Sequence, residues 1–309
     1  MDREEGESTD SVHHARSQPL AREPRSRYLR PMLRSMGPVH LTVSDLDRSL
    51  DYYRGAVGLS LLDRSGARAS LGVAGRELLV LFEERDARPV PGATGLYHFA
   101  LLVPNRVDLA QWLVHAARDH LRLVGMSDHF VSEAVYLSDP DDHGIEIYWD
   151  RPRSVWEGKV SSRLTSMPLQ VEDLMGEVRD PENSRFVGLP AETVMGHVHL
   201  KVADVPKAIA FYRDVLGFAL MAQLGRQAAF LADGGYHHHI GANTWESAGG
   251  SPPPPGSAAL RHATLVLAGA PERDRILARI HEASAVEPTE SGPMIRDPSG
   301  NALVLALPG

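Results

Sequence analysis

The chain contains no cysteine among its 309 residues. This absence excludes disulfides, thiolate metal ligands and cysteine nucleophiles together. Any bound metal must therefore be held by histidine, carboxylate and water. Fifteen histidines are present, so these side chains are the first candidates for a functional site.

Long apolar runs are also absent. No stretch approaches the roughly 20 apolar residues that a membrane-spanning helix needs, and the N-terminus lacks the basic and apolar pattern of a secretory signal. We therefore expect a cytoplasmic protein without a membrane partner. The formal net charge of -8 argues against a nucleic-acid-binding surface, because such surfaces are rich in Lys and Arg.

The composition is that of a soluble globular protein, with 43% hydrophobic and 23% charged residues. The length suits about two domains. Residues 1–35 carry many charges and almost no apolar periodicity, so they are predicted to form a disordered tail. Folding around buried cores is expected from residue 36 onward.

The clearest pattern in the chain is an internal duplication. Residues 36–43 (MGPVHLTV) and 195–202 (MGHVHLKV) are almost the same strand. After each strand comes an aspartate cap and then an amphipathic helix that stops at a glycine. The caps are Asp45 and Asp204, the glycines are Gly58 and Gly217, and short strands are predicted over 67–73, 77–82, 227–232 and 237–241.

A second kind of module follows each copy. It begins with a strand at 96–103 or 260–267, continues into a helix, and closes with an Asp-Pro turn and a last strand. The turns are at Asp139 and Asp297, and the helices are predicted over 107–120 and 271–283. The chain therefore consists of four modules, numbered one to four, in a first domain over 36–150 and a second over 193–309, joined by a proline-containing segment over 151–192.

The end of module two places a histidine, a tyrosine and a carboxylate around its Asp-Pro turn. His129 and Tyr136 precede the Asp-Pro turn, and Glu146 follows it on a strand in which apolar and polar residues alternate. This alternation places Glu146 and Tyr148 on the face opposite the apolar side chains. For Glu146 taken alone, a solvated strand carboxylate remains the alternative.

This stretch resembles the signature of extradiol ring-cleaving dioxygenases, in which a His precedes a Tyr, an Asp-Pro turn and a metal-binding Glu. The four modules resemble the vicinal-oxygen-chelate superfamily, and in detail its two-domain catechol 2,3-dioxygenase-like members. The resemblance implies an α+β fold in which four βαβββ modules pair into two barrel-like domains. It also implies a divalent metal in the concavity, with ligands near the start of a module's first strand and on its last strand. The superfamily also contains isomerases, lyases and drug-binding proteins, so the fold alone does not define the activity.

One pairing of modules supplies a complete ligand set at the positions that the resemblance implies. Module two has His98 and Glu146, and module three has His197. Two histidines and one carboxylate are a common set for non-haem iron. We therefore predict a single metal site built by modules two and three across the two halves of the chain.

The other two modules lack ligands at the same positions. Module one has Pro38, with His40 two places later, and module four has His262 but Val304 where the carboxylate would align. These two modules are expected to form a metal-free companion barrel. The alternatives are a site of modules three and four, which has no carboxylate, and a site of modules one and two, which needs His40 in place of Pro38.

Three further histidines are candidates for places around the ligands, including that of a fourth ligand, and a polar strand face remains the alternative for the run at 237–239. His239 is favoured as a group that orients substrate or a metal-bound water, with His237 on the same strand face, while His199 is expected to give structural support. Several aromatic residues are candidate substrate walls, although ordinary packing is the more common role of each. They are Tyr97, Phe130, Tyr148, Trp149 and Trp245.

The resemblance implies an extradiol dioxygenase that uses Fe(II) and O2 to cleave a catechol-type aromatic diol. Mn(II) is the alternative metal, because oxygen and nitrogen ligands accept both ions. The resemblance further implies that His129 is an acid/base group, that Tyr136 donates a hydrogen bond to a substrate oxygen, and that the protein forms a homodimer. Two rivals remain: a glyoxalase-like isomerase or lyase, and a metal-free binding protein for a small aromatic compound.

Overall fold

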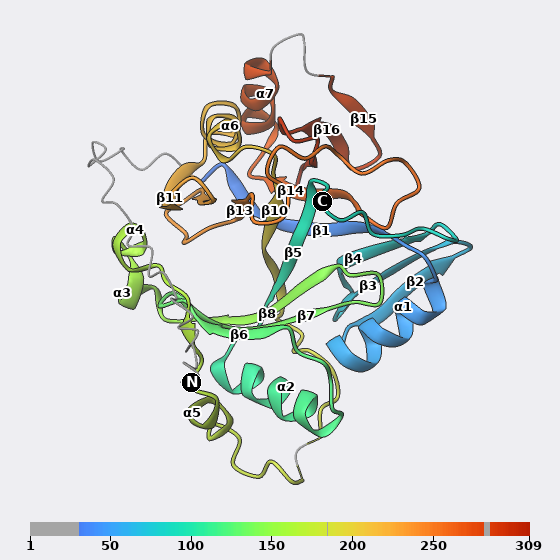
Figure 1. The fold of residues 1–309 in the computed structure, drawn as a ribbon, viewed down its shortest axis with the longest axis vertical. Coiled ribbons are helices and arrows are strands. Elements are labelled where there is room, and N and C mark those ends of the chain that lie inside the picture. The colour runs from blue at the N-terminus through green and yellow to red at the C-terminus, as the bar shows by residue number, and fades with distance from the viewer. Residues whose placement is uncertain (1–30, 184, 281–284) are drawn as a thin grey trace, which may run out of the picture.

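The computed structural model describes residues 31–183, 185–280 and 285–309. Within these residues the strands form two curled sheets, and helices pack against the faces of the sheets that turn away from each curl (Figure 1). The predicted α+β fold with repeated strand-helix-strand modules is confirmed. No described helix has both the length and the apolar character needed to cross a membrane.

The strands of the first half of the chain are β1 (Leu33–Val43), β2 (Ser60–Ser65), β3 (Arg68–Val73), β4 (Arg76–Glu83), β5 (Gly95–Leu102), β6 (Gly125–Asp128), β7 (Ser132–Ser138), β8 (Gly144–Asp150) and β9 (Met167–Pro168). Those of the second half are β10 (Val194–Lys201), β11 (Ala219–Leu224), β12 (Ala228–Ala232), β13 (Ile240–Asn243), β14 (Leu260–Leu267), β15 (Glu287–Thr289), β16 (Gly292–Arg296) and β17 (Ala302–Ala306). The helices are α1 (Leu46–Tyr52), α2 (Arg106–Arg118), α3 (Arg153–Trp156), α4 (Val160–Arg163), α5 (Val171–Met175), α6 (Val205–Ala210) and α7 (Ala270–Arg279). Two π-helical turns, η1 (Tyr53–Val57) and η2 (Phe211–Leu216), extend α1 and α6.

The two sheets do not follow the two halves of the chain. One sheet, here called the central sheet, joins modules two and three in the order β11-β12-β13-β10-β5-β8-β7-β6-β9. The other, the companion sheet, joins modules one and four in the order β15-β16-β17-β14-β1-β4-β3-β2. The predicted pairing of modules is therefore confirmed. The division into 36–150 and 193–309 describes the repeat in the sequence, because each sheet takes strands from both halves.

The helices of modules one and three begin at the predicted aspartate caps, and their π-helical extensions end at the predicted glycines. The Asp45 and Asp204 side chains cap α1 and α6 by accepting a hydrogen bond from the backbone N–H three residues later. Gly58 and Gly217 end the π-helical turns with φ angles of 92° and 89°. These angles are left-handed, a conformation that glycine adopts without a steric penalty.

Some predicted boundaries are wrong. The tail predicted over 1–35 ends earlier, because β1 begins at Leu33. The Leu33 side chain is buried, and its backbone N–H donates to Asp233. Residues 1–30 of the predicted tail lie outside the described residues. The strand predicted over 237–241 begins only at Ile240, after a turn with two left-handed glycines, Gly234 and Gly235. Strand β2 is missing from the prediction, because its side chains are mostly exposed and show no alternation. Helix α7 ends at Arg279, and residues 281–284 of the predicted helix lie outside the described residues.

The same buried hydrogen bond holds each half of the chain together. The Tyr53 hydroxyl in η1 donates to Asp139 at the Asp-Pro turn of module two, and the Tyr212 hydroxyl in η2 donates to Asp297 in module four, both over 2.9 Å. In each turn the other carboxylate oxygen accepts two backbone N–H groups. Each bond therefore ties a helix of one sheet to a turn of the other.

We expect Tyr53→Phe and Tyr212→Phe each to lower the free energy of unfolding by about 1–3 kcal/mol, because each removes a donor from a buried carboxylate. Denaturant titration measures this loss. The two sites share no partner, so the losses should add in the double variant. Tyr52→Phe is the matched control, and a loss as large as that of Tyr53→Phe would contradict the role of the Tyr53 bond.

Candidate metal centre

Three candidate metal ligands lie on neighbouring strands of the central sheet. His98 is on β5, Glu146 on β8 and His197 on β10, and β5 runs between the other two strands. Ala100 lies two residues after His98 on the same face, and it is opposite Glu146 on one side and His197 on the other. Its small side chain leaves room for the three longer side chains to meet above it.

The ligand atoms of these residues converge on one point. The Nε2 atoms of His98 and His197 lie 2.9 and 3.1 Å from the same oxygen, Glu146 Oε2. All three ligand atoms lie within 4.8 Å of one another, and all three side chains are buried. The structure therefore brings together the three ligands that the sequence suggests.

This arrangement fits a divalent metal. His98 Nε2 approaches Glu146 without the angles of a hydrogen bond, so it is a buried nitrogen that has no hydrogen-bond partner among the described residues. Buried polar atoms of native proteins normally have a partner, and a cation shared with His197 and Glu146 would provide one. Two imidazoles and one carboxylate are the set that holds non-haem Fe(II) with open positions.

The protonation states suit metal binding as well. Burial acts to raise the pKa of Glu146, but its interactions with His197 and His98 outweigh burial and hold the pKa well below its usual range. Burial lowers the pKa of His197, although the Glu146 carboxylate opposes this change. The site therefore offers an ionised carboxylate and a neutral imidazole, the forms in which these groups bind a metal.

Two close approaches beside the ligands require glycine. A Cβ atom on Gly196 would lie 1.9 Å from the Tyr148 hydroxyl, and one on Gly144 would lie 2.0 Å from the backbone oxygen of Tyr97. Glycine at 196 thus lets Tyr148 pack against His197, with ring centroids 4.9 Å apart. Glycine at 144 lets β8 begin close to β5.

His129 and Tyr136 are hydrogen-bonded to each other next to Glu146. Tyr136 is the direct cross-strand partner of Glu146, and its hydroxyl lies 2.6 Å from His129 Nε2. His129 Nδ1 lies 2.7 Å from the Thr165 carbonyl oxygen, which only accepts, so Nδ1 carries the proton. In the neutral ring, Nε2 then accepts from Tyr136. Burial, with the charge of Glu146, raises the pKa of Tyr136 well above its usual range, so its hydroxyl stays protonated.

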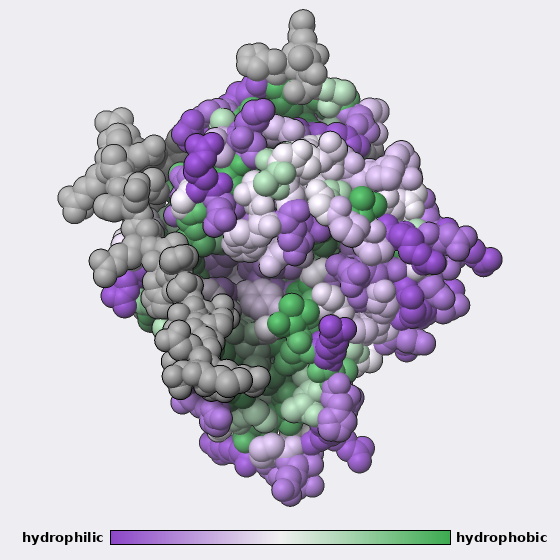
Figure 2. Space-filling view, viewed as in Figure 1, coloured by the Kyte–Doolittle hydropathy of each residue, from purple (hydrophilic) through white to green (hydrophobic). Residues whose placement is uncertain are grey.

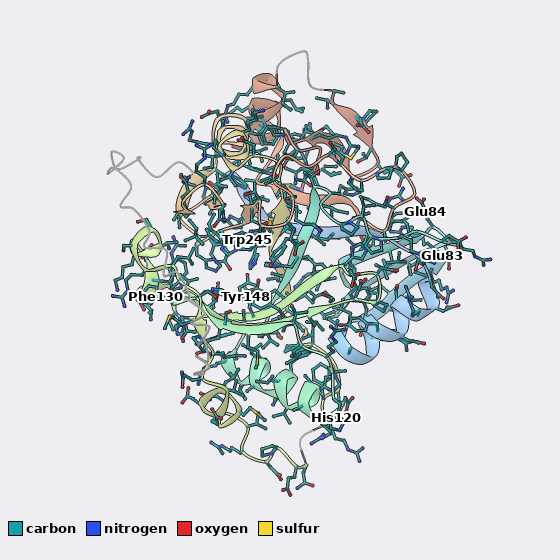
Figure 3. The ribbon with its side chains drawn as sticks, in the orientation of Figure 1. Glu83, Glu84, His120, Phe130, Tyr148 and Trp245 are labelled. Carbon is teal, nitrogen blue, oxygen red and sulfur yellow. The ribbon has the colours of Figure 1, made fainter. Side chains whose placement is uncertain are left out.

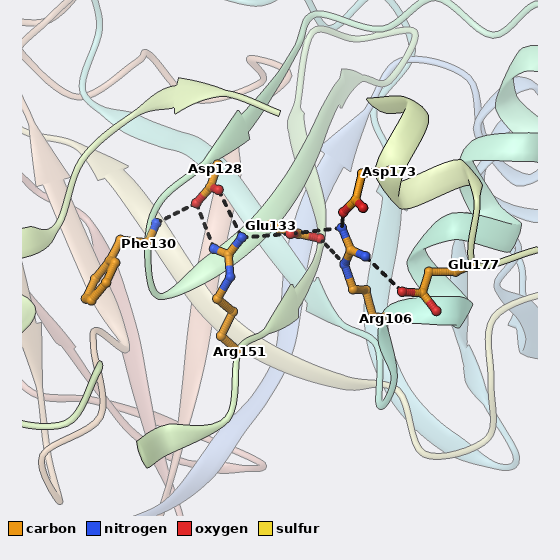
Figure 4. Close-up of polar contacts among 7 residues, drawn as sticks. All are labelled: Arg106, Asp128, Phe130, Glu133, Arg151, Asp173 and Glu177. Atoms are coloured by element: carbon orange, nitrogen blue, oxygen red, sulfur yellow. Dashed lines mark hydrogen bonds and ion pairs between the residues drawn. The ribbon is translucent and has the colours of Figure 1, made fainter. Parts of the chain in front are cut away.

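A network of ion pairs fixes the loop that carries His129 (Figure 4). Arg151 binds both oxygens of Asp128 at 2.7 and 2.9 Å and also Glu133 at 2.7 Å. The Phe130 N–H donates to Asp128, which supports Phe130 at a φ of 68°. On the far side of Glu133, Arg106 continues the network to two carboxylates of the connecting segment, Asp173 and Glu177.

The three-histidine run points in different directions. The sequence favours His239 beside the metal, but in the structure His239 packs against Tyr236 and its Nδ1 accepts a hydrogen bond from the Asp233 N–H. His238, which the sequence argument does not single out, has its ring centroid 4.1 Å from that of His197. The run precedes β13, so strand alternation does not apply to it. The only available sequence signal for His238 is the histidine run itself.

His237 connects His238 to a partly buried carboxylate. Its Nε2 lies 2.8 Å from Asp150 Oδ1, and its Nδ1 lies 2.8 Å from His238 Nδ1. The carboxylate only accepts, so His237 Nε2 carries the proton, and in the neutral pair His238 Nδ1–H donates to His237. His238 Nε2 is then unprotonated beside His197. The second Asp150 oxygen accepts from the Tyr236 hydroxyl.

Aromatic rings cover the other side of His98. His199 and Tyr97 lie 5.0 and 5.4 Å from it between centroids, and Trp245 packs against both of them. Tyr97 is the extra residue of a β-bulge, because His98 pairs with His199 while Leu96 pairs with Leu200. A bulge of this kind re-aims a side chain, and it turns Tyr97 toward the ligands.

The figures place these rings within the molecule. Phe130, Tyr148 and Trp245 lie around the hollow of the central sheet, whereas Glu83 and Glu84 lie apart from it on the companion side (Figure 3). Hydrophobic residues gather in the recessed middle of the same view, with hydrophilic residues around the periphery (Figure 2). The ring contacts of Tyr97, Tyr148 and His199 with His98 and His197 give the ligands an aromatic surrounding.

Comparison with known proteins agrees with this architecture. A family model described as "Glyoxalase/Bleomycin resistance protein/Dioxygenase superfamily" matches residues 35–147 and 194–305. The chain belongs to this superfamily. Within it, the chain is 38% identical over 276 residues to Catechol-2,3-dioxygenase of Bacillus subtilis (strain 168), which covers 87% of this chain and 95% of the relative.

Solved structures share the fold of this superfamily member. A dioxygenase candidate from Bacillus subtilis subsp. subtilis str. 168 matches with a TM-score of 0.60 at 14% identity, covering 90% of this chain and 87% of the other. Glyoxalase I from Zea mays matches with a TM-score of 0.55 at 16% identity, covering 88% and 92%. At these identities both matches support the fold alone.

We expect His197→Ala to abolish tight iron binding, because it removes one of three converging ligands. His262→Ala, at a histidine of the companion sheet, should retain the metal. Metal analysis after anaerobic loading with Fe(II) and desalting gives the stoichiometry of each variant. Retention by His197→Ala with loss by His262→Ala would contradict a site between modules two and three.

Arg151→Gln should lower the free energy of unfolding by about 1–3 kcal/mol, because Asp128 and Glu133 lose a charged donor. Burial acts to raise the pKa of Asp128, but the bonds from Arg151 and Phe130 outweigh it and lower the pKa. The stabilisation is therefore present above about pH 4 and is lost as the pH falls further. Arg64→Gln, which breaks an exposed pair with Asp47, is the control and should change the stability much less, because exposed ion pairs are weak. Equal losses at neutral pH would contradict the role of Arg151.

Proposed function

We propose that this protein is an extradiol ring-cleaving dioxygenase that uses Fe(II) and O2 on a catechol-type aromatic diol. The similarity to a catechol-2,3-dioxygenase over most of both chains supports an oxidoreductase of this type. The observation that carries the proposal is the convergence of His98, Glu146 and His197 beside the hydrogen-bonded pair of His129 and Tyr136. Mn(II) is the alternative metal.

A bound metal and the surrounding side chains would have different roles in the reaction. Fe(II) held by the three ligands would supply adjacent open positions for the two diol oxygens and for dioxygen. His98, Glu146 and His197 would hold the metal, since all three come from the same face of the central sheet. Tyr97, His199 and Trp245 form an aromatic wall against which a flat ring packs.

His129 is placed to move a proton of the diol. Its Nε2 is unprotonated in the neutral ring, since Nδ1–H is bound to the Thr165 carbonyl. It accepts the proton that a diol hydroxyl loses and can return it later in the reaction. Once Nε2 carries this proton, it donates to the Tyr136 oxygen, which leaves the single Tyr136 hydroxyl proton free to donate to a substrate oxygen. His238 presents a second unprotonated imidazole from the opposite side of the ligands, next to His197.

The two rivals account for fewer of these features. Glyoxalase-like enzymes of this fold commonly use a second carboxylate ligand, whereas the converging group among the described residues has one carboxylate, and module three places histidines nearby. A metal-free binding protein gives no reason for two buried histidine nitrogens that converge on one carboxylate oxygen, Glu146 Oε2.

The direct test is oxygen uptake by anaerobically Fe(II)-loaded protein against a panel of catechols, with the visible absorbance of the product followed at the same time. We expect stoichiometric uptake and a yellow ring-opened product. Bound iron without uptake across the panel would favour the glyoxalase-like rival. Absence of bound metal would favour the binding protein.

His129→Gln should lower kcat by roughly 10²–10⁴-fold, the usual contribution of a general acid/base group. Its iron content should stay unchanged, because His129 is not among the converging ligands. His262→Ala is the control and should keep full activity. Loss of iron in parallel with activity would mean that His129 acts on assembly of the site rather than on proton transfer.

A further inference from the structure

The companion sheet has the same strand pairing as the metal site, but different side chains at the equivalent positions. His40 on β1 pairs with His262 on β14, just as His199 pairs with His98 in the central sheet. Val304 pairs with Thr264 at the place where Glu146 pairs with Ala100. The companion site therefore keeps two imidazoles and has no carboxylate at the equivalent position.

The two imidazoles do not form a metal site. The His40 and His262 rings are stacked, with centroids 3.9 Å apart and planes 28° apart. The lone pairs of imidazole nitrogens lie in the ring plane, so stacked rings direct them side by side rather than toward one point. Pro38, which occupies the place of His197 in the repeated strand, supplies no ligand atom.

Guanidinium groups lie around this histidine pair. Arg261 is the extra residue of a β-bulge, because His262 pairs with His40 while Leu260 pairs with Leu41. The bulge corresponds to the one that turns Tyr97 toward the metal ligands. The Arg261 guanidinium lies 4.4 Å from the centroid of Phe82, whose ring stacks against His40 at 5.9 Å.

A second guanidinium belongs to Arg68, which is opposite Phe82 in the register of β3 and β4. Burial, with the nearby charges of His262, Arg68 and Arg261, lowers the pKa of His40 to about 3. Arg68 and Arg261 are linked to His40 through Phe82, which is the register partner of Arg68 and whose ring contacts both the Arg261 guanidinium and the His40 ring. In the neutral ring, His40 adds a donor or acceptor but no charge.

Carboxylates and one hydroxyl contact these cations over long distances; the hydroxyl is Thr42 Oγ1, 3.4 Å from Arg261. Arg261 is 3.3 Å from Glu84, and Arg68 is 3.5 Å from both Asp63 and Glu77. The side chains of Arg261 and Arg68 are 40% and 38% exposed. Long, exposed ion pairs are weak, and each guanidinium has five N–H donors.

Two buried polar atoms at the same place lack partners. His40 Nδ1 and Thr264 Oγ1 have no hydrogen-bond partner among the described residues. Such atoms are uncommon in folded proteins and call for a partner that completes them. Cations, a stacked aromatic wall and unpartnered polar atoms together suit a flat ligand that bears a negative charge.

We propose that the inner face of the companion sheet around His40, Phe82, Arg68, Arg261 and His262 binds a small planar carboxylate. The carboxylate accepts from the two guanidiniums, as arginine favours. The flat body of the ligand packs on Phe82 and the histidine pair. This site is separate from the metal centre and does not depend on the dioxygenase activity.

The test uses sodium benzoate as the probe and its neutral analogue benzamide. Isothermal titration of the full-length protein should show benzoate binding at millimolar concentrations and at least about tenfold weaker binding of benzamide. Arg261→Gln and the double variant with Arg68→Gln should each weaken benzoate binding by at least about tenfold, and Arg261→Lys should keep part of it. Both arginine side chains are partly exposed, so the variants should fold, and their unfolding midpoints check this.

Two matched variants locate the binding. Arg226→Gln, at an exposed arginine in the turn between β11 and β12, should leave benzoate affinity unchanged. Glu146→Gln, which alters the metal centre, should also leave it unchanged. The proposal is overturned if benzoate does not bind, if benzamide binds equally, if the arginine double variant binds as the parent does, or if Glu146→Gln removes the binding.

Discussion

The antiparallel pairing of β5 with β10 is the constraint on which the candidate site depends. It sets His98 of the first half beside His199 of the second and places Ala100 opposite His197. Glu146 joins them because β8 pairs with the other edge of β5. The ligands come from two halves of the chain, so neither half can build the site alone. Any change that shifts this register by one residue would turn the ligands to the opposite face.

Strand alternation lets the same strands serve both the core and the site. Phe99, Leu101 and Ile147 are fully buried on the helix-facing side of the central sheet, while His98, Ala100 and Glu146 occupy the other side. The apolar side therefore stabilises the sheet that positions the polar side. This explains how a carboxylate and several imidazoles are held in a buried place at a defined separation, although burying them is costly by itself.

The duplicated modules form two sheets with one backbone plan and different side chains at equivalent places. Both have a histidine pair across the joining strands and a β-bulge that turns one side chain inward. In the central sheet the bulge carries Tyr97 and the last strand carries Glu146, which suits a cation. In the companion sheet the corresponding residues are Arg261 and Val304, which suits an anion. The backbone thus defines where a ligand can lie, and a few side chains define its charge.

The sequence by itself determined the modules and the helix caps at Asp45 and Asp204, because these follow from repeats and from local hydrogen bonding. The candidate ligands His98, Glu146 and His197 followed from the resemblance to the vicinal-oxygen-chelate superfamily, which says where in a module the ligands lie. Only the tertiary structure decided the neighbours of His197. The histidine run follows a glycine turn instead of lying on a strand, so His238 approaches the ligands and His239 turns away. The hydrogen bond from His129 to the Thr165 carbonyl could not be predicted from the sequence either. It joins residues 36 positions apart, and the segment that contains Thr165 shows no periodicity. Local patterns specify elements, whereas contacts between distant residues specify which atoms meet.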